Sequence, residues 1–293
     1  MASGLTATPD ATENPPSVAL RRHLPPEGGD HGGATPQASV HPSRKGKGAR
    51  GKGFPDDTES RFCRTELLFG PDGMEKLSKA RVAVFGLGGV GGYAAEALVR
   101  SGVGTLDLID HDRVSESNLN RQILATADTI GRYKADVARE RALSINPDAI
   151  VTAYKVFYAP DTAGRFDFTR YDYVVDAIDT VTAKLALAQR AYASGVPLIS
   201  CMGTGNKLYP GMLEVSDIYQ TSICPLARVM RKELRKRGIP RLKVVWSREE
   251  PLTPKQGGPV RDSGRPAPGS TAFVPAAAGI MLAAEVVRDL LAR

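Results

Sequence analysis

Glycines, carboxylates and cations that could handle a nucleotide are concentrated in the middle of this 293-residue chain. A glycine-rich turn with Gly86, Gly88, Gly89 and Gly91 follows the apolar run 81–85 and precedes a helical pattern of apolar residues. Such a turn lets backbone amides approach a phosphate closely, and the amino terminus of the helix adds free N–H groups and a favourable dipole. The pattern therefore predicts a nucleotide phosphate site.

Polar side chains after the next predicted strand narrow the choice of nucleotide. Asp110 comes at the end of strand 106–109, where a carboxylate can accept hydrogen bonds from ribose hydroxyls, as in a nicotinamide enzyme. The following segment differs from a hydride-transfer site, because it supplies Arg121 and then Lys134 for the phosphates. Adenylation needs such cations to neutralise a developing pyrophosphate. We therefore expect ATP rather than a dinucleotide.

These residues resemble the ATP-dependent activating enzymes of the ThiF and MoeB type, which are related to ubiquitin-activating enzymes. The shared patterns are Gly-x-Gly-Gly-x-Gly, an aspartate pair, Ser-Asn-x-x-Arg-Gln, a lysine and a later Asp-Ala-x-Asp, here 176–179. The resemblance implies that Asp179 holds Mg²⁺ near the α-phosphate and that Arg121 and Lys134 contact the phosphates. The implied ATP-binding residues are Gly86, Gly88, Gly89, Gly91, Asp110, Asp112, Asn118, Arg121, Gln122 and Lys134.

Three further stretches, 61–70, 202–208 and 224–235, resemble one branch of this family, the tRNA threonylcarbamoyladenosine dehydratases. This resemblance implies ATP-dependent cyclisation of N6-threonylcarbamoyladenosine in tRNA through an acyl adenylate, with release of AMP and pyrophosphate. Where members of this branch often have Ala and Asp, this chain has Thr204 and Tyr209, which leaves the fine substrate contacts open.

Two other classes of function remain as alternatives. One is an adenylyltransferase that activates the carboxyl terminus of a ubiquitin-like sulfur-carrier protein. Relatives of that kind usually hold a structural zinc with two Cys-x-x-Cys pairs, and the three cysteines of this chain contain no such pair. The other is a nicotinamide oxidoreductase or a silent nucleotide-binding module, which would not need Arg121, Lys134 and Asp179.

Arg64 precedes the glycine turn in a segment that cannot easily reach its own site. The resemblance implies a homodimer in which this arginine crosses to the ATP of the partner subunit as a catalytic residue. Arg61 competes for that role, and a surface ion pair with Glu66 is the simpler interpretation.

The predicted helix 226–237 is the best signal for nucleic acid. Apolar residues fall on one face, and the predicted RNA-binding residues Arg228, Arg231, Lys232 and Arg235 fall on the other. Such a stripe suits contact with an RNA backbone, and the formal net charge of +7 agrees with tRNA as partner. The expected extension of this basic patch consists of Lys236, Arg237, Arg241, Lys243 and Arg248.

Cysteine chemistry is the least determined part of the site. Some relatives receive the adenylate on a thiol, and Cys224 is the candidate near the variable region. A buried cysteine at the start of a helix is the simpler interpretation. Some relatives also draw on a cysteine desulfurase pathway, whose proteins are possible partners.

Composition separates residues 1–58, which are rich in Pro, Gly, Ser and Thr, from an activating domain at 59–293. We expect the first segment to be disordered, and its basic cluster within 44–52 to be a solvated tail. No window resembles a membrane span, signal peptide or transit peptide, and the few unpaired cysteines fit a reducing cytosol, so we expect a cytoplasmic protein.

Strands alternate with helices after the glycine turn, which predicts an α/β fold with a Rossmann-like, doubly wound sheet. The sheet is expected to be mainly parallel, and strands 212–218 and 242–246 to extend it with antiparallel pairing. The Pro- and Gly-rich stretch 251–268 is predicted to be a mobile lid.

Overall fold

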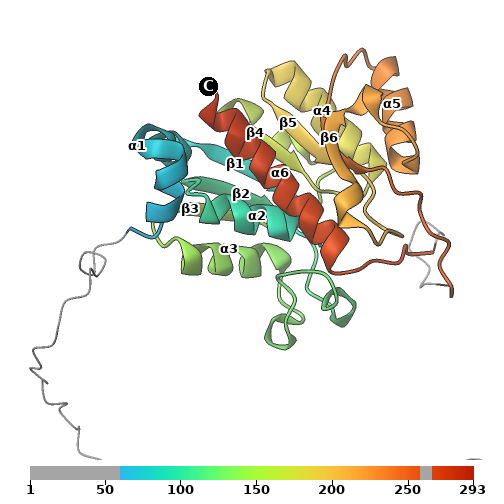
Figure 1. The fold of residues 1–293 in the computed structure, drawn as a ribbon, viewed down its shortest axis with the longest axis horizontal. Helices are drawn as coiled ribbons and strands as arrows, with labels where there is room; N and C mark the ends of the chain where they lie inside the picture. Colours follow the sequence, from blue (N-terminus) through green and yellow to red (C-terminus); the bar gives the residue numbers. More distant parts are fainter. Residues whose placement is uncertain (1–59, 258–265) are drawn as a thin grey trace, which may run out of the picture. The chain divides into compact units, whose positions relative to one another are not determined.

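The computed structural model of the protein describes residues 60–257 and 266–293. The predicted disordered extension at 1–58 lies outside the described residues, and so does the middle of the predicted lid. The described residues belong to one compact unit (Figure 1).

A seven-stranded sheet runs through this unit in the order β3-β2-β1-β4-β5-β7-β6. Its strands are β1 (Arg81–Phe85), β2 (Thr105–Ile109), β3 (Ile150–Tyr154), β4 (Tyr173–Asp176), β5 (Leu198–Cys201), β6 (Leu213–Asp217) and β7 (Lys243–Ser247). The pairs from β3 to β7 are parallel, and β6 pairs with β7 antiparallel. The predicted fold class is therefore confirmed.

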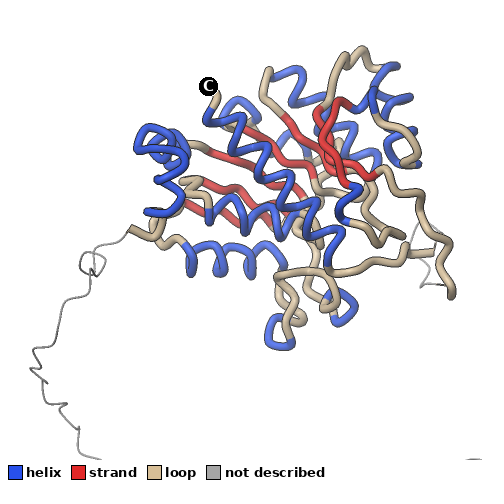
Figure 2. The backbone as a smooth tube through the Cα atoms, in the orientation of Figure 1, coloured by secondary structure: helices blue, strands red, loops and turns tan. Residues whose placement is uncertain are grey.

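Helices cover both faces of the sheet (Figure 2). They are α1 (Cys63–Lys79), α2 (Gly91–Arg100), α3 (Lys134–Ile145), α4 (Val181–Ser194), α5 (Pro225–Lys236) and α6 (Phe273–Leu291). Apolar side chains of α1, α2, α3 and α6 form one hydrophobic core with the sheet, and those of α4 and α5 form the core on the other face. Because a core covers each face of the sheet, its inner strands are nearly continuous runs of apolar residues.

The last two strands extend the sheet with antiparallel pairing, as predicted, because β6 pairs antiparallel with β7. The prediction did not specify how they join the rest of the sheet, and β7 pairs with β5 in parallel. Four of the five residues of β7 are buried, whereas β6 is largely half-buried at the edge. The strand with the stronger apolar pattern therefore takes the inner position, where both of its faces are covered.

Helix α6 crosses the sheet beside α2 (Figure 1). A Cβ added to Gly279 would lie 2.2 Å from the carbonyl oxygen of Val90, so only glycine permits this approach. The contact fixes the helix that follows the glycine turn. Within the described ranges, no helix is long and apolar enough to cross a membrane.

Candidate active site

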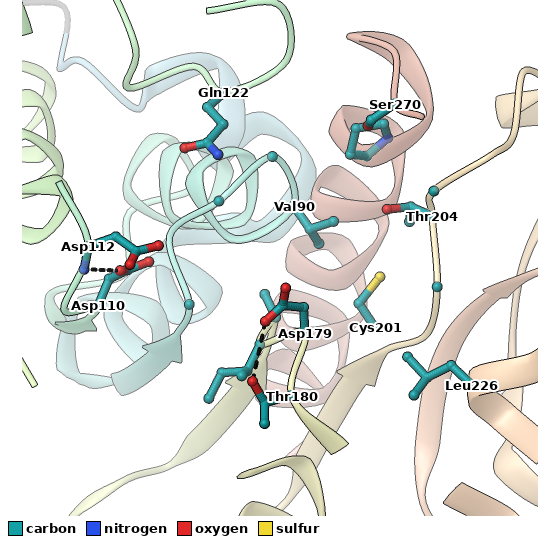
Figure 3. Close-up of a pocket in the computed structure, with 18 of the residues that line it drawn as sticks. Val90, Asp110, Asp112, Gln122, Asp179, Thr180, Cys201, Thr204, Leu226 and Ser270 are labelled. Atoms are coloured by element: carbon teal, nitrogen blue, oxygen red, sulfur yellow. Dashed lines mark hydrogen bonds between the residues drawn. The ribbon is translucent and has the colours of Figure 1, made fainter. Parts of the chain in front are cut away.

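A cavity of about 670 Å³ opens at the carboxyl ends of β1, β2, β4 and β5 (Figure 3). Such an edge is where ligands bind in doubly wound sheets, because the loops after parallel strands meet there. The predicted residues that line the cavity are Gly86, Gly88, Gly89, Asp110, Asp112, Asn118, Arg121, Gln122, Lys134 and Asp179. The structure therefore brings together ten residues that are spread between positions 86 and 179 of the sequence.

Gly91 is the predicted nucleotide contact that does not line the cavity. It lies under the turn, where an added Cβ would meet the carbonyl oxygen of Gly86 at 1.7 Å. Gly86 has φ of +87°, and its Cβ would lie 2.7 Å from the carbonyl oxygen of Ala177. These two glycines let the turn and β4 pack closely, and they place the amides of Gly88 and Gly89 at the cavity.

Asp110 is held rigidly at the end of β2. Its Oδ2 accepts a hydrogen bond from the backbone N–H of Leu87 at 2.7 Å, and its Oδ1 accepts one from the backbone N–H of Asp112 at 2.8 Å (Figure 3). A carboxylate oxygen has a second lone pair, so both oxygens can still accept a ligand hydroxyl. The first link ties the carboxylate directly to the glycine turn.

Lys134 begins α3 and is buried, although it carries a charge. Its Nζ donates to Asp112 Oδ2 at 2.7 Å, and its backbone N–H donates to the carbonyl oxygen of Asp112 at 2.9 Å. This double link places the ammonium group at the cavity wall. A cation held in that position needs little reorganisation when an anionic ligand arrives.

The turn 117–122 supplies the remaining polar groups of this wall. Arg121 Nη1 donates to the carbonyl oxygen of Ser117 at 2.7 Å and to Asn120 Oδ1 at 2.9 Å. Asn118 Oδ1 accepts the backbone N–H of Ser115 at 3.2 Å. Gln122 is buried, and its Oε1 has no hydrogen-bond partner within the described residues. A buried acceptor without a donor is costly, and a ligand hydroxyl or amino group in the cavity would satisfy it.

The two aspartates of the 176–179 motif differ in their surroundings. Asp179 is exposed, and Figure 3 shows its carboxylate in the middle of the cavity, where Thr180 Oγ1 lies 3.4 Å from its Oδ1. Asp176 is fully buried and accepts hydrogen bonds from Ser200 Oγ at 2.6 Å and Lys184 Nζ at 3.1 Å. Asp179 is therefore placed to contact a ligand, whereas Asp176 stabilises the buried ends of the strands below the cavity.

Lys184 is a site-supporting residue that the sequence interpretation missed. Besides Asp176, its Nζ donates to the carbonyl oxygen of Cys201 at 2.7 Å, so it ties the ends of β4 and β5 together. The signal was present in the sequence, because Lys184 stands between Ala183 and Leu185 on the apolar side of a helix. A lysine there needs a buried partner.

We call the residues Gly86, Gly88, Gly89, Asp110, Asp112, Asn118, Arg121, Gln122 and Lys134 the glycine-turn wall. The opposite side, which we call the α5 wall, consists of Thr204, Leu226, Val229 and Ser270. Figure 3 shows Asp110, Asp112 and Gln122 on one side of the cavity and Thr204, Leu226 and Ser270 on the other, with Asp179 between them. The cavity therefore has two chemically different sides.

Asn206 assembles the α5 wall. Its backbone has φ of +58°, its backbone N–H donates to the carbonyl oxygen of Gly269 at 2.7 Å, and its Oδ1 accepts the backbone N–H of Gly269 at 2.6 Å. Its carbonyl oxygen accepts the backbone N–H of Leu252 at 2.8 Å. Residues on both sides of the undescribed segment are thus fixed to one asparagine, which tolerates the left-handed conformation better than most side chains.

The two cysteines near the cavity, Cys201 and Cys224, are buried rather than poised for attack. Cys224 precedes α5 and is buried, in agreement with the simpler interpretation of its role. Cys201 lines the cavity, and burial raises the pKa of its thiol to about 12. A thiol with such a pKa stays protonated near neutral pH and is a poor nucleophile.

Arg64 lies on α1, away from the cavity of its own chain. It is exposed and makes no ion pair within the described residues, so the expected pair with Glu66 is not seen. Arg61 instead donates to Asn146 Oδ1 at 2.7 Å and pairs with Asp148 at 2.5 Å. The neighbouring Leu67 and Leu68 are 85% and 82% exposed.

Helix α5 carries the predicted basic face in a modified form. Arg228, Lys232 and Arg235 are exposed, whereas Arg231 is half-buried and donates to the carbonyl oxygen of Thr221 at 2.8 Å. Val229, predicted to lie on the core side, is 44% exposed. The core contacts come from Ala227, Met230 and Leu234, because the apolar stripe is rotated slightly from the predicted one.

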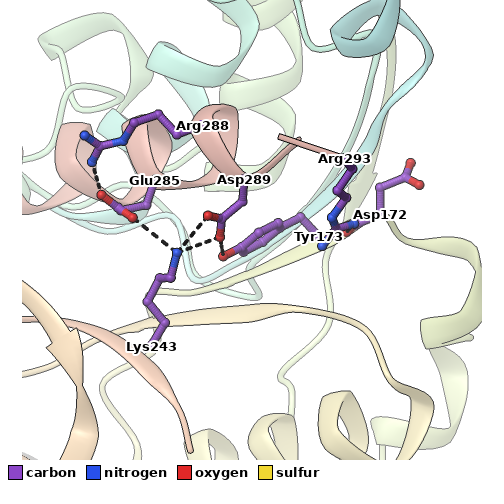
Figure 4. A network of polar contacts seen from close by, with 7 residues as sticks. All are labelled: Asp172, Tyr173, Lys243, Glu285, Arg288, Asp289 and Arg293. Atoms are coloured by element: carbon purple, nitrogen blue, oxygen red, sulfur yellow. Dashed lines mark hydrogen bonds and ion pairs between the residues drawn. The ribbon is translucent and has the colours of Figure 1, made fainter. Parts of the chain in front are cut away.

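The expected extension of the basic patch is only partly present. Lys243 points instead into a network at the opposite edge of the sheet, where its Nζ lies 2.7 Å from Asp289 Oδ2 and 3.2 Å from Glu285 Oε2 (Figure 4). Tyr173 also donates to Asp289. Lys236 and Arg237 pair with Glu233, and Arg248 pairs with Glu214, so their charges are partly neutralised.

The chain belongs to the ThiF family, whose model matches residues 62–293. A tRNA threonylcarbamoyladenosine dehydratase of Bacillus subtilis is 41% identical over 240 residues, which cover 78% of this chain and 94% of the relative. The crystal structure of E. coli tRNA N6-threonylcarbamoyladenosine dehydratase in complex with ATP has a TM-score of 0.72 and 33% identity, and it covers 79% of this chain and 94% of that chain. A sulfur carrier protein adenylyltransferase of Thermus thermophilus is 40% identical over 141 residues, covering 47% of this chain and 52% of the relative.

Proposed function

We propose that the chain is an ATP-dependent enzyme that dehydrates N6-threonylcarbamoyladenosine in tRNA to its cyclic form. The observation that carries this proposal is the cavity in which the glycine turn, Asp110, the two cations and Asp179 meet. The similarity to dehydratases over most of their length, including a structure with ATP, supports the same reaction. The sulfur-carrier relative matches only about half of its own length, and this favours the dehydratase.

The glycine-turn wall is suited to ATP. The cavity offers backbone amides for phosphates, the fixed carboxylate of Asp110 for the ribose hydroxyls, and an unsatisfied acceptor on Gln122. Asn118 supports this pocket. Lys134 and Arg121 would neutralise the charge that develops when pyrophosphate leaves. These assignments follow the sequence prediction, and the shared cavity supports them.

Asp179 is suited to hold Mg²⁺, because a carboxylate in the open middle of the cavity is the kind of ligand that this ion accepts. Mg²⁺ would supply charge neutralisation at the phosphates. The carboxylate oxygen of the threonyl group attacks the α-phosphorus of ATP, which forms an acyl adenylate and releases pyrophosphate. The carbamoyl group of the same side chain then displaces AMP and closes the ring, so no protein thiol is required.

The tRNA would lie along the exposed cations of α5, namely Arg228, Lys232 and Arg235, next to the cavity mouth. Arg231 can contribute only in part, because Thr221 already accepts from it. Phosphate contacts of this kind provide affinity that weakens with salt.

A homodimer would complete the site. Arg64 is too far along α1 to line the cavity of its own chain, and Leu67 and Leu68 expose apolar surface beside it. Burial of these leucines against a second copy would carry Arg64 to the ATP of the partner subunit.

We further propose that the activating domain spans 59–293 and that the protein is cytoplasmic. Proteins of a cysteine desulfurase pathway are proposed as partners.

The test is AMP release from labelled ATP by the purified protein. We expect AMP with tRNA that bears threonylcarbamoyladenosine and none with unmodified tRNA. AMP formation with a sulfur-carrier protein that ends in Gly-Gly, and none with modified tRNA, would overturn the proposal.

A further inference from the structure

The α5 wall is the part of the cavity to which the proposed binding of ATP assigns no role. Its four side chains carry no charge, whereas the glycine-turn wall holds the charged groups that suit a nucleotide. Asp179 marks the boundary between them (Figure 3). A second substrate must reach the α-phosphorus from a side that ATP leaves open. The α5 wall is such a side, because it lies across Asp179 from the glycine-turn wall.

The α5 wall is a built surface and not a loose loop. A Cβ added to Gly203 would lie 3.9 Å from both Cys224 Sγ and Leu226 Cβ, so the chain after β5 packs on the first turn of α5. A Cβ added to Gly205 would lie 2.8 Å from Pro268 Cβ, so the same chain packs on the segment before α6. Asn206 adds the two hydrogen bonds to Gly269 described above. The wall is therefore fixed before any substrate arrives.

The exposed side chains of this wall suggest what it binds. Val229 is 44% exposed although it lines the cavity, and Leu226 is half-buried beside it. Thr204 presents a hydroxyl toward the centre of the cavity in Figure 3, and this hydroxyl has no hydrogen-bond partner within the described residues. We call the side chains of Leu226 and Val229 the apolar shelf. An apolar surface next to a free hydroxyl fits a ligand with an apolar face and a polar end.

The direction of α5 supports an RNA-borne ligand. Lys232 follows Val229 by three residues, so both lie on the same side of the helix, and Arg228 adjoins them. The shelf inside the cavity therefore continues into exposed cations outside it. A nucleotide that enters the cavity here would leave its backbone phosphates beside these cations.

The geometry points to the α5 wall as the subsite for the modified nucleoside, with Leu226 and Val229 contacting its apolar face and Thr204 hydrogen-bonding its threonyl group. This inference rests on the proposed function and deepens it, because it names the residues that decide which acyl group is adenylated. Thr204 and Val229 would then be specificity residues that touch the nucleoside and not ATP.

The test compares two variants that add the same charge to neighbouring exposed positions. Val229→Asp places a carboxylate on the shelf, and Ile223→Asp places one at a position that is 41% exposed but does not line the cavity. Ile223 has φ of +42°, which aspartate tolerates. KM for modified tRNA and KM for ATP are measured for both variants by AMP release.

We expect Val229→Asp to raise KM for modified tRNA by about tenfold or more, because a carboxylate would be desolvated against the nucleoside. KM for ATP stays unchanged, and Ile223→Asp alters KM for modified tRNA by no more than about twofold, as is usual for an exposed charge outside a contact. Equal effects of the two variants on KM for modified tRNA would overturn the inference, and so would a rise in KM for ATP with Val229→Asp.

A second variant removes only a hydroxyl. Thr204→Val keeps the shape of the side chain, and we expect kcat/KM for modified tRNA to fall by about tenfold because a hydrogen bond to the substrate is lost. An unchanged kcat/KM would contradict the role of Thr204. If the unaltered protein forms no AMP with modified tRNA, the proposed function fails and the inference falls with it. If the unaltered protein is active and the variants behave alike, the inference alone fails.

Discussion

The two walls of the cavity are built in different ways. The glycine-turn wall comes from one continuous stretch between β1 and the start of α3, and its charged groups are fixed by short hydrogen bonds such as those from Leu87 and Asp112 to Asp110. The α5 wall is assembled from chain segments near 204, 226 and 270, which meet through packing and through Asn206. Local sequence therefore specifies the charged wall, whereas long-range contacts specify the uncharged one.

This difference predicts separable effects of substitution. Changes below both walls should damage the whole site, changes in the glycine-turn wall or at Asp179 should affect the chemistry of ATP, and changes in the α5 wall should affect tRNA alone. The following variants test each case.

Lys184→Met should have the largest effect, because it breaks a buried ion pair beneath both walls. Removal of one partner leaves the carboxylate of Asp176 buried without its cation, and we expect unfolding free energy to fall by about 3–5 kcal/mol. Urea unfolding measures the change. The double variant Asp176→Asn with Lys184→Met should recover part of the loss, and a loss below about 1 kcal/mol in the single variant would show that the pair does not support the site.

Asp179→Asn should separate chemistry from stability. The side chain is exposed, so the melting temperature should hardly change, whereas kcat for AMP formation should fall about 100- to 1000-fold because transition-state charge is no longer balanced. Steady-state kinetics at saturating Mg²⁺ measures this. Asp128→Asn, a change at an exposed aspartate that does not line the cavity, is the control and should leave kcat unchanged. Equal activity of the two variants would contradict the role of Asp179.

Asn206→Ala should affect the α5 wall alone. We expect kcat/KM for modified tRNA to fall about tenfold, because Gly269 loses an acceptor that positions Ser270, and KM for ATP to stay the same. Asn206→Asp keeps the Oδ1 acceptor and should restore most of the activity. Asn206→Gly keeps the backbone conformation without the acceptor and should resemble the alanine variant; activity equal to that of the unaltered protein would assign the effect to backbone strain.

Asp289→Asn should affect neither wall and should have the smallest effect. Burial acts to raise the pKa of Asp289, but hydrogen bonds from Lys243 and Tyr173 outweigh it and hold the pKa below the usual value of 3.8. The ionised form therefore stabilises the fold by about 1 kcal/mol or less at neutral pH, since the pair is partly exposed. This contribution is complete above pH 3.8 and is lost as pH falls through the lowered pKa. Urea unfolding at neutral and acid pH checks that the difference between variant and unaltered protein shrinks with acid, while kcat stays the same.

The glycine-turn wall could be predicted from the sequence because its determinants are local. A glycine turn after an apolar strand must lie at the strand's carboxyl end, and Asp110 follows the neighbouring strand, so both had to meet at one edge. The antiparallel pairing of β6 with β7 was also predicted. The parallel pairing of β7 with β5 was left unspecified, because strand direction there depends on packing that a pattern of apolar residues does not encode.

Charged residues outside this wall could not be assigned from the sequence. Lys243 was expected in the basic patch, but it lies on β7 and its partner Asp289 is 46 residues away on α6. Arg231 was expected on the RNA-binding face of the helix, yet it donates to the carbonyl oxygen of Thr221, which lies before α5. Asn206 was noted only as part of the stretch 202–208, because its contacts with Gly269 depend on tertiary structure. A cation in a sequence reveals its charge but not its partner.

The mass of the target nucleoside after one turnover tests the central claim most directly. With excess protein, ATP, Mg²⁺ and tRNA that bears threonylcarbamoyladenosine, we expect the nucleoside to lose one water while one AMP forms for each modified tRNA. Asp179→Asn should yield neither product. A nucleoside of unchanged mass despite AMP formation would contradict the account, because it would show that the protein adenylates another acceptor.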